Sequence, residues 1–475
     1  MMIQTPKAIA AVLFALLTLA PITAAATAST RPPNILLIYA DDLGWRDLAH
    51  LGSDYYQTPN LDRLAREGMV FTDAYAAAAM CAPSRAALMA GQYPARLDFY
   101  GMAGLTPSRA DMKVLQILGQ RKYRPKDLSI AEVLRRHGYV TGMVGKWQLG
   151  EDRDTEPAAR GFTFVYETAN PKPPDPNSPA GPKRIGELTK AASEFITTNQ
   201  DKPFFLYFSH HAVHSPLSAT LEKLEKFGAR PRGQYHDNPM YAAVLEHLDD
   251  SVGEILELLR ERGLDENTLV IFSSDNGSTA FSSQRPLRGQ KGNYNEGGIR
   301  IPLLFRWTGT IAPGRSSSTP VNQIDIYPTL LAVAEVPPPA GRVLDGVSLL
   351  PLLKSSGELS ERSLFWHFPR YQLWRSVDGT QTAIRQRPVS VVRKGDWKLT
   401  LLHEEWLADE GRDRNPFLAL PLYNLSTDPG EVSNLAHVEK AKRAELLEEL
   451  LEWLRSTGAR LATKPNPAYR PGSAR

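Results

Sequence analysis

Residues 35–42 read Ile35-Leu36-Leu37-Ile38-Tyr39-Ala40-Asp41-Asp42, an apolar run that ends in two carboxylates. Three further apolar runs, at residues 139–144, 204–208 and 269–272, also lead into charged or metal-binding side chains. Runs of this length, rich in β-branched and aromatic residues, are typical of strands that are buried on both faces. The sequence therefore predicts four central strands with polar residues beyond their ends.

Two segments with apolar residues at helical spacing, 128–137 and 241–262, lie between or beside these runs. Alternation of strands and helices predicts an α/β fold, in which a mostly parallel sheet is flanked by helices. In such sheets, ligands bind beyond the carboxyl ends of the strands. We therefore expect the polar residues that follow the four runs to meet in one active site.

The first residues predict a cleaved signal peptide, residues 1–26. Its apolar run from Ile9 to Ala20 is about 12 residues long, shorter than the roughly 20 that a membrane-spanning helix needs. Small residues at 24–26 suit signal peptidase. We therefore expect a protein that is exported, either periplasmic or secreted, without a membrane anchor.

The remaining chain of about 450 residues suggests two domains, or one large domain with an appendage. Residues 389–400 predict an antiparallel hairpin, and residues 441–454 predict an amphipathic helix. We therefore expect a catalytic domain over residues 32–350 and a smaller C-terminal α+β subdomain over residues 351–475, made of an antiparallel sheet plus a helix.

Charge and cysteine content narrow the class of protein. The formal net charge is +3 and no basic stripe stands out, so we expect no nucleic-acid partner. The single cysteine, Cys81, cannot form an internal disulfide in an exported chain. Cys81 is therefore either a buried thiol or a residue retained for its chemistry.

The neighbours of Cys81 favour chemistry. Cys81-Ala82-Pro83-Ser84-Arg85 predicts a helix that begins near Pro83, which puts the thiol close to a helix N-terminus. The string resembles the C-x-P-S-R signature of the sulfatase family, in which a dedicated maturation enzyme oxidises the cysteine to formylglycine. The resemblance implies that Cys81 becomes the formylglycine nucleophile and that the maturation enzyme is a partner.

Further segments resemble the same family, in the expected order, over about residues 33–436. They are Gly145-Lys146-Trp147-Gln148-Leu149-Gly150, residues 210–216 with His214, Leu287-Arg288-Gly289-Gln290-Lys291-Gly292, and an E-G-G-x-R-x-P segment at residues 296–302. The resemblance implies an alkaline-phosphatase-like fold and hydrolysis of a sulfate ester. It implies catalytic roles for Arg85, Lys146, His214 and Lys291, which would stabilise or protonate the reacting group.

A metal site is predicted at the ends of two runs. Asp41 and Asp42 follow the first run, and Asp275 and Asn276 follow the last. Four oxygen-bearing residues fit one hard cation, Ca²⁺ or Mg²⁺, better than two unrelated turns. The resemblance implies that the ion is a single Ca²⁺ that contacts the sulfate of the substrate.

Position 148 departs from the family pattern, because Gln148 stands where a histidine is usual. A glutamine has no titratable proton and cannot serve as the base of the last step, but it can hydrogen-bond the hydrated aldehyde. We expect turnover to survive, with water, His210 or His211 as the base.

The substrate is expected to be a sulfated small molecule or glycan, with a carbohydrate favoured over a purely aryl compound. Residues 365–371, which include His367, contain aromatic and basic side chains that suit sugar rings. We expect His367 to contact the substrate at the pocket mouth. A core strand with an exposed end is the alternative for this segment.

Two other functions remain open. A phosphatase or phosphonate hydrolase on the same fold would share the metal and the cations, but a second hard metal would require further His and Asp ligands that the matching segments lack. A sulfated-glycan-binding protein that has lost turnover would account for Gln148. An unmodified thiol at Cys81 would favour this binding protein.

Overall fold

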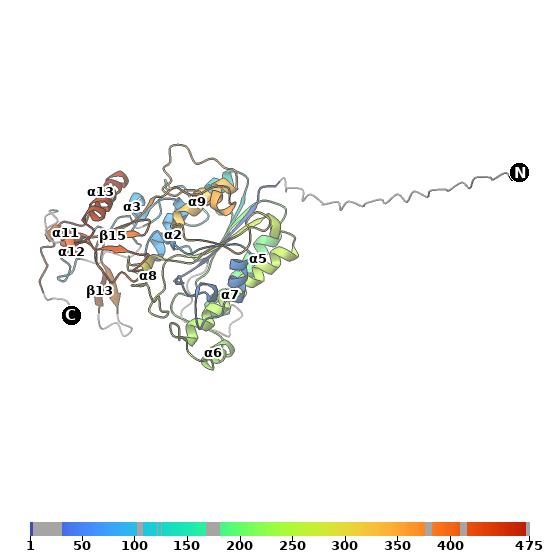
Figure 1. Cartoon of the computed structure of the whole chain (residues 1–475), viewed down its shortest axis with the longest axis horizontal. Helices are drawn as coiled ribbons and strands as arrows, with labels where there is room; N and C mark the ends of the chain where they lie inside the picture. The colour runs from blue at the N-terminus through green and yellow to red at the C-terminus, as the bar shows by residue number, and fades with distance from the viewer. Residues whose placement is uncertain are drawn as a thin grey trace. The chain divides into compact units, whose positions relative to one another are not determined.

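The computed structural model describes residues 1–2, 31–101, 108–120, 122–124, 126–167, 181–375, 382–408 and 416–471 (Figure 1). The fold lies within one unit, Arg31–Arg475. The predicted signal peptide falls almost wholly outside the described residues, so its cleavage stays a prediction. In the described part of the chain, no helix combines the length and the apolar character that crossing a bilayer requires.

The larger sheet has eight strands and is mostly parallel, with β8 antiparallel to both of its neighbours. The four apolar runs form β1, β4, β6 and β7, which confirms the predicted strands. In spatial order the strands are β5 (Phe164–Glu167), β4 (Val140–Gly145), β6 (Phe204–Ser209), β1 (Asn34–Ala40), β7 (Thr268–Ser274), β8 (Leu303–Arg306), β2 (Met69–Phe71) and β9 (Arg315–Ser317).

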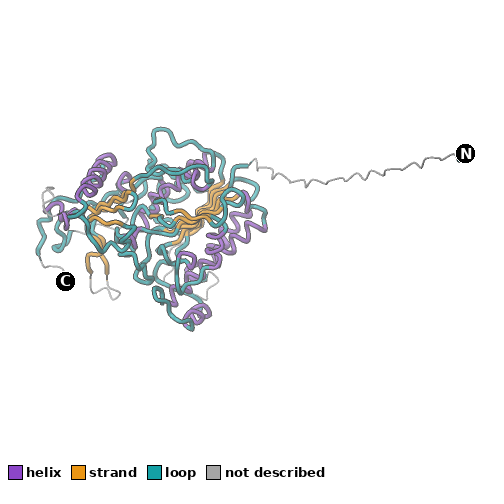
Figure 2. The backbone as a smooth tube through the Cα atoms, in the orientation of Figure 1, coloured by secondary structure: helices purple, strands orange, loops and turns teal. Residues whose placement is uncertain are grey.

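Helices cover both faces of this sheet, as Figure 2 shows. Two of them match the helices expected at residues 128–137 and 241–262, namely α4 and α7, and α4 begins with a capping box made by Ser129 and Glu132. The helices are α1 (Pro59–Arg66), α2 (Cys81–Ala90), α3 (Pro94–Leu97), α4 (Ile130–Arg136), α5 (Ile185–Thr198), α6 (Leu221–Gly228), α7 (Pro239–Glu261), α8 (Glu296–Ile299), α9 (Ile326–Val333), α10 (Leu350–Leu353), α11 (His403–Ala408), α12 (Pro416–Ala419) and α13 (Lys440–Thr457).

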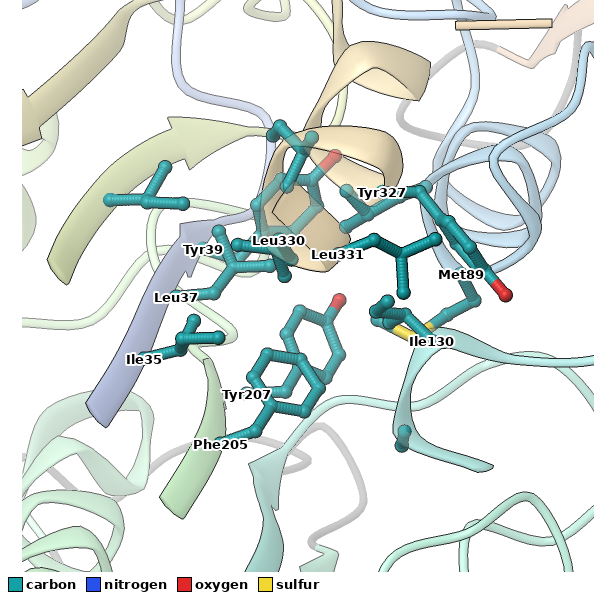
Figure 3. Packing of buried hydrophobic residues seen from close by; sticks show 14 of the residues in the cluster. Ile35, Leu37, Tyr39, Met89, Ile130, Phe205, Tyr207, Tyr327, Leu330 and Leu331 are labelled. Carbon is teal, nitrogen blue, oxygen red and sulfur yellow. The ribbon is translucent and has the colours of Figure 1, made fainter. Parts of the chain in front are cut away.

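Alternate residues of β1 supply two separate hydrophobic cores, because successive side chains of a strand point to opposite faces. Ile35 and Leu37 pack on the face covered by α2, α4 and α9, where Figure 3 shows them beside Tyr207 and Leu330. Leu36 and Ile38 pack on the other face, with α1, α5 and α7. Burial on both faces explains why this strand is an uninterrupted apolar run.

The C-terminal part contains a four-stranded antiparallel sheet, which confirms the expected smaller sheet with its hairpin and helix. Leu446 and Leu450 of α13 pack in one core with Val392 and Leu399 of the sheet. Its strands are β11 (Ser363–Phe368), β14 (Val389–Lys394), β15 (Trp397–Leu402) and β16 (Leu422–Asn424). Two short pairs complete the strands: β3 (Ala74–Tyr75) with β10 (Val321–Asn322), and β12 (Gln372–Arg375) with β13 (Thr382–Gln386). A domain boundary at residue 350 stays a prediction.

Candidate active site

The ends of β1 and β7 bring the four predicted metal ligands together. The two strands pair in parallel, with Ala40 opposite Ser274, so the residues that follow them are neighbours. The Asp42 backbone N–H donates to Asp275 Oδ1 at 3.1 Å, and Asn276 Nδ2 donates to Asp42 Oδ1 at 2.8 Å. Asp41, Asp42, Asp275 and Asn276 are all buried.

Cys81 begins α2 and lies against the same carboxylates. Its Sγ is 3.4 Å from Asp41 Oδ1 and 3.8 Å from Asp42 Oδ1, and the residue is 4% exposed. Burial, reinforced by the negative charge of Asp275, raises the pKa of the Cys81 thiol well above its ordinary value. An unmodified thiol at this place is therefore protonated at neutral pH and is a poor nucleophile.

Two lysine ammonium groups reach the same carboxylates from other segments. Lys146, directly after β4, donates to Asp41 Oδ2 at 2.5 Å, and the Lys291 Nζ lies 2.6 Å from Asp42 Oδ1. Burial opposes their positive charge, but the nearby aspartates outweigh it and raise the pKa of both lysines. Both side chains therefore carry a positive charge at neutral pH and are suited to binding an anion.

Arg85 lies one helical turn after Cys81 and is 1% exposed. Its guanidinium forms a 2.7 Å ion pair with Asp275 and donates to the Tyr207 hydroxyl at 3.0 Å and to Ser209 Oγ at 2.5 Å. The contacts tie α2 to the ends of β6 and β7. Arg85 therefore fixes the position of Cys81 relative to Asp275.

The three histidines of the segment 210–216 differ in their surroundings. His214 Nε2 is 3.7 Å from Asp42 Oδ2, and its side chain is 27% exposed. His210 is fully buried and packs on the Phe208 ring, with a centroid distance of 4.1 Å. Burial lowers the pKa of both His210 and His211 to about 3. The latter two are therefore neutral and weakly basic, whereas His214 reaches the site from a partly open position.

The donor set fits a hard cation. Three carboxylates and one amide offer the oxygen ligands that Ca²⁺ prefers. Cys81 and His214 also lie close enough to Asp41 and Asp42 to complete a metal-binding group. Asn276 Oδ1 is buried and has no hydrogen-bond partner among the described residues, and an oxygen left in this state is one that a bound cation would satisfy. Burial and the charge of Asp41 raise the pKa of Asp275, a strain that a neighbouring cation would relieve.

The two residues predicted to contact substrate lie in different surroundings. Gln148 is exposed, two residues beyond Lys146, with φ of 61°. His367 is only 3% exposed, and its Nδ1 shares a 2.8 Å hydrogen bond with Ser390 Oγ while its ring packs against Tyr100 and His403. The contacts described for His367 include no residue of the active site. This burial favours the alternative in which residues 365–371 form a core strand.

A buried charge network supports the segment that carries Lys291. The Lys398 Nζ on β15 lies 2.9 Å from Glu296 Oε1 and 3.0 Å from Glu431 Oε1, and all three residues are inaccessible to solvent. The Glu431 carboxylate also accepts a 2.7 Å hydrogen bond from the backbone of Glu296. Glu431 therefore joins the C-terminal sheet to α8.

Lys183 is a neighbour of the site that sequence reasoning missed. It is buried, donates to the Pro216 carbonyl at 3.3 Å, and responds to the charges of Asp41 and Lys146. Burial lowers the pKa of Lys183 to about 8, although Asp41 acts in the opposite direction. No sequence motif surrounds Lys183, so only the folded structure shows that it lies near the site.

Comparison with protein families agrees with the geometry. A family model described as Sulfatase matches residues 33–336, and one described as N-sulphoglucosamine sulphohydrolase, C-terminal, matches residues 290–459. The chain is 34% identical to N-acetylgalactosamine-6-sulfatase of Mus musculus over 396 residues, covering 74% of this chain and 72% of the relative. It is 33% identical to arylsulfatase A of Homo sapiens over 479 residues, covering 90% and 88%.

Solved structures show the same architecture. Ps i-CgsB, in a crystal structure with k-i-k-neocarrahexaose, superposes with a TM-score of 0.72 at 27% identity, covering 89% of this chain and 93% of that one. The phosphonate monoester hydrolase of Agrobacterium radiobacter superposes with a TM-score of 0.63 at 21% identity, covering 89% and 95%. The second likeness concerns the fold alone.

Proposed function

The chain belongs to the sulfatase family and is a sulfuric ester hydrolase, and we propose that it removes sulfate from a carbohydrate with a formylglycine made from Cys81. The observation that carries the proposal is the convergence of Cys81, Asp41, Asp42, Lys146 and Lys291 within direct contact distances at one edge of the sheet. A maturation enzyme would act on Cys81 as its partner.

Formylglycine would suit this position because the cysteine itself is held protonated. When hydrated, the modified residue supplies two hydroxyls on one carbon, one to attack sulfur and one whose proton loss expels sulfate as the aldehyde returns. Lys146 and Lys291 would bind the sulfate oxygens and stabilise the charge that grows on them during transfer. Arg85 would keep Asp275 and the nucleophile aligned.

The alcohol that leaves the substrate needs a proton, and His214 or Lys291 would donate it as the sulfur–oxygen bond breaks. The later proton loss needs a base. The pKa values near 3 of His210 and His211 make these histidines weak candidates, and the amide of Gln148 cannot accept the proton as a base. The exposure of Gln148 supports water as the acceptor, with the Gln148 amide available to hydrogen-bond the hydrated aldehyde.

Asp41, Asp42, Asp275 and Asn276 would hold one Ca²⁺, which would supply positive charge beside the sulfate. The three carboxylates of the site are otherwise balanced by Arg85, Lys146 and Lys291. A divalent ion would therefore give the site an excess positive charge, as the binding of a sulfate ester anion requires.

A carbohydrate substrate is supported by two of the comparisons. One relative is named for N-acetylgalactosamine 6-sulfate, and one structural neighbour was crystallised with a neocarrahexaose. Export to the periplasm or the outside of the cell, where such glycans are met, is supported by the signal-like residues 1–26.

Purified, matured protein is expected to release sulfate from at least one member of a panel of sulfated mono- and oligosaccharides. The matched phosphate esters should react more slowly, because the described site offers ligands for one metal rather than two. Ion chromatography of released sulfate and phosphate measures both rates. Faster release of phosphate would favour the phosphatase alternative, and tight glycan binding without any release would favour the binding-protein alternative.

A further inference from the structure

Arg385, on β13, lies against the segment that carries Lys291. Arg385 Nη1 donates to the Lys291 carbonyl at 3.1 Å, and Asn293 Nδ2 donates to the Arg385 carbonyl at 3.0 Å. A Cβ added to Gly292, whose φ is 89°, would lie 3.2 Å from both Arg385 Cδ and Gln372 Cγ. The β12–β13 pair, whose strand β13 is marked in Figure 1, is therefore packed directly onto this edge of the active site.

Among the residues that the structure describes, no Asp or Glu forms an ion pair with the guanidinium of Arg385. The side chain is partly buried. By contrast, Arg300 and Arg393 near the same segment both pair with Asp73. Burial lowers the pKa of Arg385, with Asp42 acting in the opposite direction, so Arg385 feels the charge of a proposed metal ligand. A partly desolvated cation that lacks a counter-charge is a favourable place for an anionic group of a ligand.

Resting on the proposed hydrolysis of a sulfate ester, we propose that Arg385 determines specificity by binding a second acidic group of the substrate. The sulfate that reacts would be held by Lys146 and Lys291, so Arg385 would contact the part that leaves as the alcohol. A guanidinium presents parallel donors that match a carboxylate or a sulfate. The preferred substrate is therefore a sulfated sugar that carries either a carboxylate or a second sulfate.

Three related substrates test this proposal. They are a monosulfated N-acetylhexosamine, the same sugar linked to a uronic acid, and the same sugar with a second sulfate. Wild-type kcat/KM should be higher for at least one of the two doubly acidic substrates than for the monosulfated sugar. A higher value for the uronic-acid conjugate would show that Arg385 binds a carboxylate, and a higher value for the disulfated sugar would show that it binds a sulfate. In Arg385→Ala this preference should fall about 10- to 100-fold, the range for a charge-assisted hydrogen-bonded pair. Arg385→Lys should restore part of it.

Matched controls separate specificity from folding. Arg135→Ala, on the exposed face of α4, should keep the wild-type preference, and thermal melting should show that all variants are folded. An unchanged preference in Arg385→Ala, or an equal loss on all three substrates, would overturn the role of Arg385. A wild-type enzyme that cleaves sulfated sugars without favouring the acidic ones would also overturn it. If matured wild-type protein cleaves none of the three but releases sulfate from another sugar of the panel, this inference is overturned while the proposed function stands. If it releases sulfate from no sugar of the panel, the proposed function fails as well.

Discussion

Cys81→Ser should lower steady-state turnover by a factor on the order of 10⁴, because a serine supplies one hydroxyl where formylglycine supplies two. The serine oxygen can attack sulfur and release the first alcohol. It cannot then expel sulfate by re-forming an aldehyde, so the serine sulfate ester must wait for hydrolysis by water. The fold should persist, because a serine hydroxyl can take the place of the Cys81 thiol, whose Sγ lies 3.4 Å from Asp41 Oδ1.

Rapid-quench kinetics measure this expectation directly. Cys81→Ser should release at most one alcohol per active site, and intact-mass spectrometry should find one sulfate attached to the protein. Cys81→Ala is the matched control and should show neither. Repeated turnover by Cys81→Ser at a rate close to that of the wild type would rule out a mechanism that depends on the second hydroxyl.

Asp42→Asn should reduce kcat/KM by a factor on the order of 10³, because one carboxylate serves several parts of the site. Asp42 accepts hydrogen bonds from Lys291 and from Asn276, and it lies 3.8 Å from Cys81 Sγ. An amide keeps the shape but removes the charge that would hold Ca²⁺. The effect should therefore appear in metal binding as well as in activity.

A binding readout tests the metal site separately from turnover. For wild-type protein, Ca²⁺ at a hundredfold excess over its Kd should stabilise the fold by about 2.7 kcal/mol, as linkage requires. Asp42→Asn should lose most of this stabilisation, whereas Asp250→Asn, exposed on α7, should keep it. Equal calcium stabilisation of wild type and Asp42→Asn, measured by thermal denaturation and by isothermal titration, would remove Asp42 from the proposed ligands.

The central strands, and the meeting of their ends at one edge of the sheet, could be predicted from the sequence for a physical reason. A strand buried on both faces must be apolar throughout, so β1 and β7 are recognisable without knowledge of their partners. Parallel strands end at the same edge of a sheet, so Asp41 and Asp42 were expected to lie near Asp275, and the Asp42 backbone N–H does donate to Asp275 Oδ1. The signature around Cys81 could be recognised because its parts are contiguous along the chain.

The sequence does not predict which side chains tertiary packing brings to the site. Arg385 reaches the site only because the β12–β13 pair packs against Gly292, and no local pattern specifies that contact. Lys183 has its low pKa because it is buried near Lys146. For His367, sequence left two interpretations open, since alternation along β11 does not tell which face meets a pocket and which meets β14 and its neighbours.

We propose that residue 81 carries formylglycine within this cluster of carboxylates and cations. The most direct measurement is mass spectrometry of the tryptic peptide of residues 67–85, from protein made in a host that has the maturation enzyme. We expect a peptide in which the sulfur of residue 81 is lost and an aldehyde reacts with a hydrazide probe. An intact Cys81 thiol throughout a preparation that fully hydrolyses sulfate esters would contradict it.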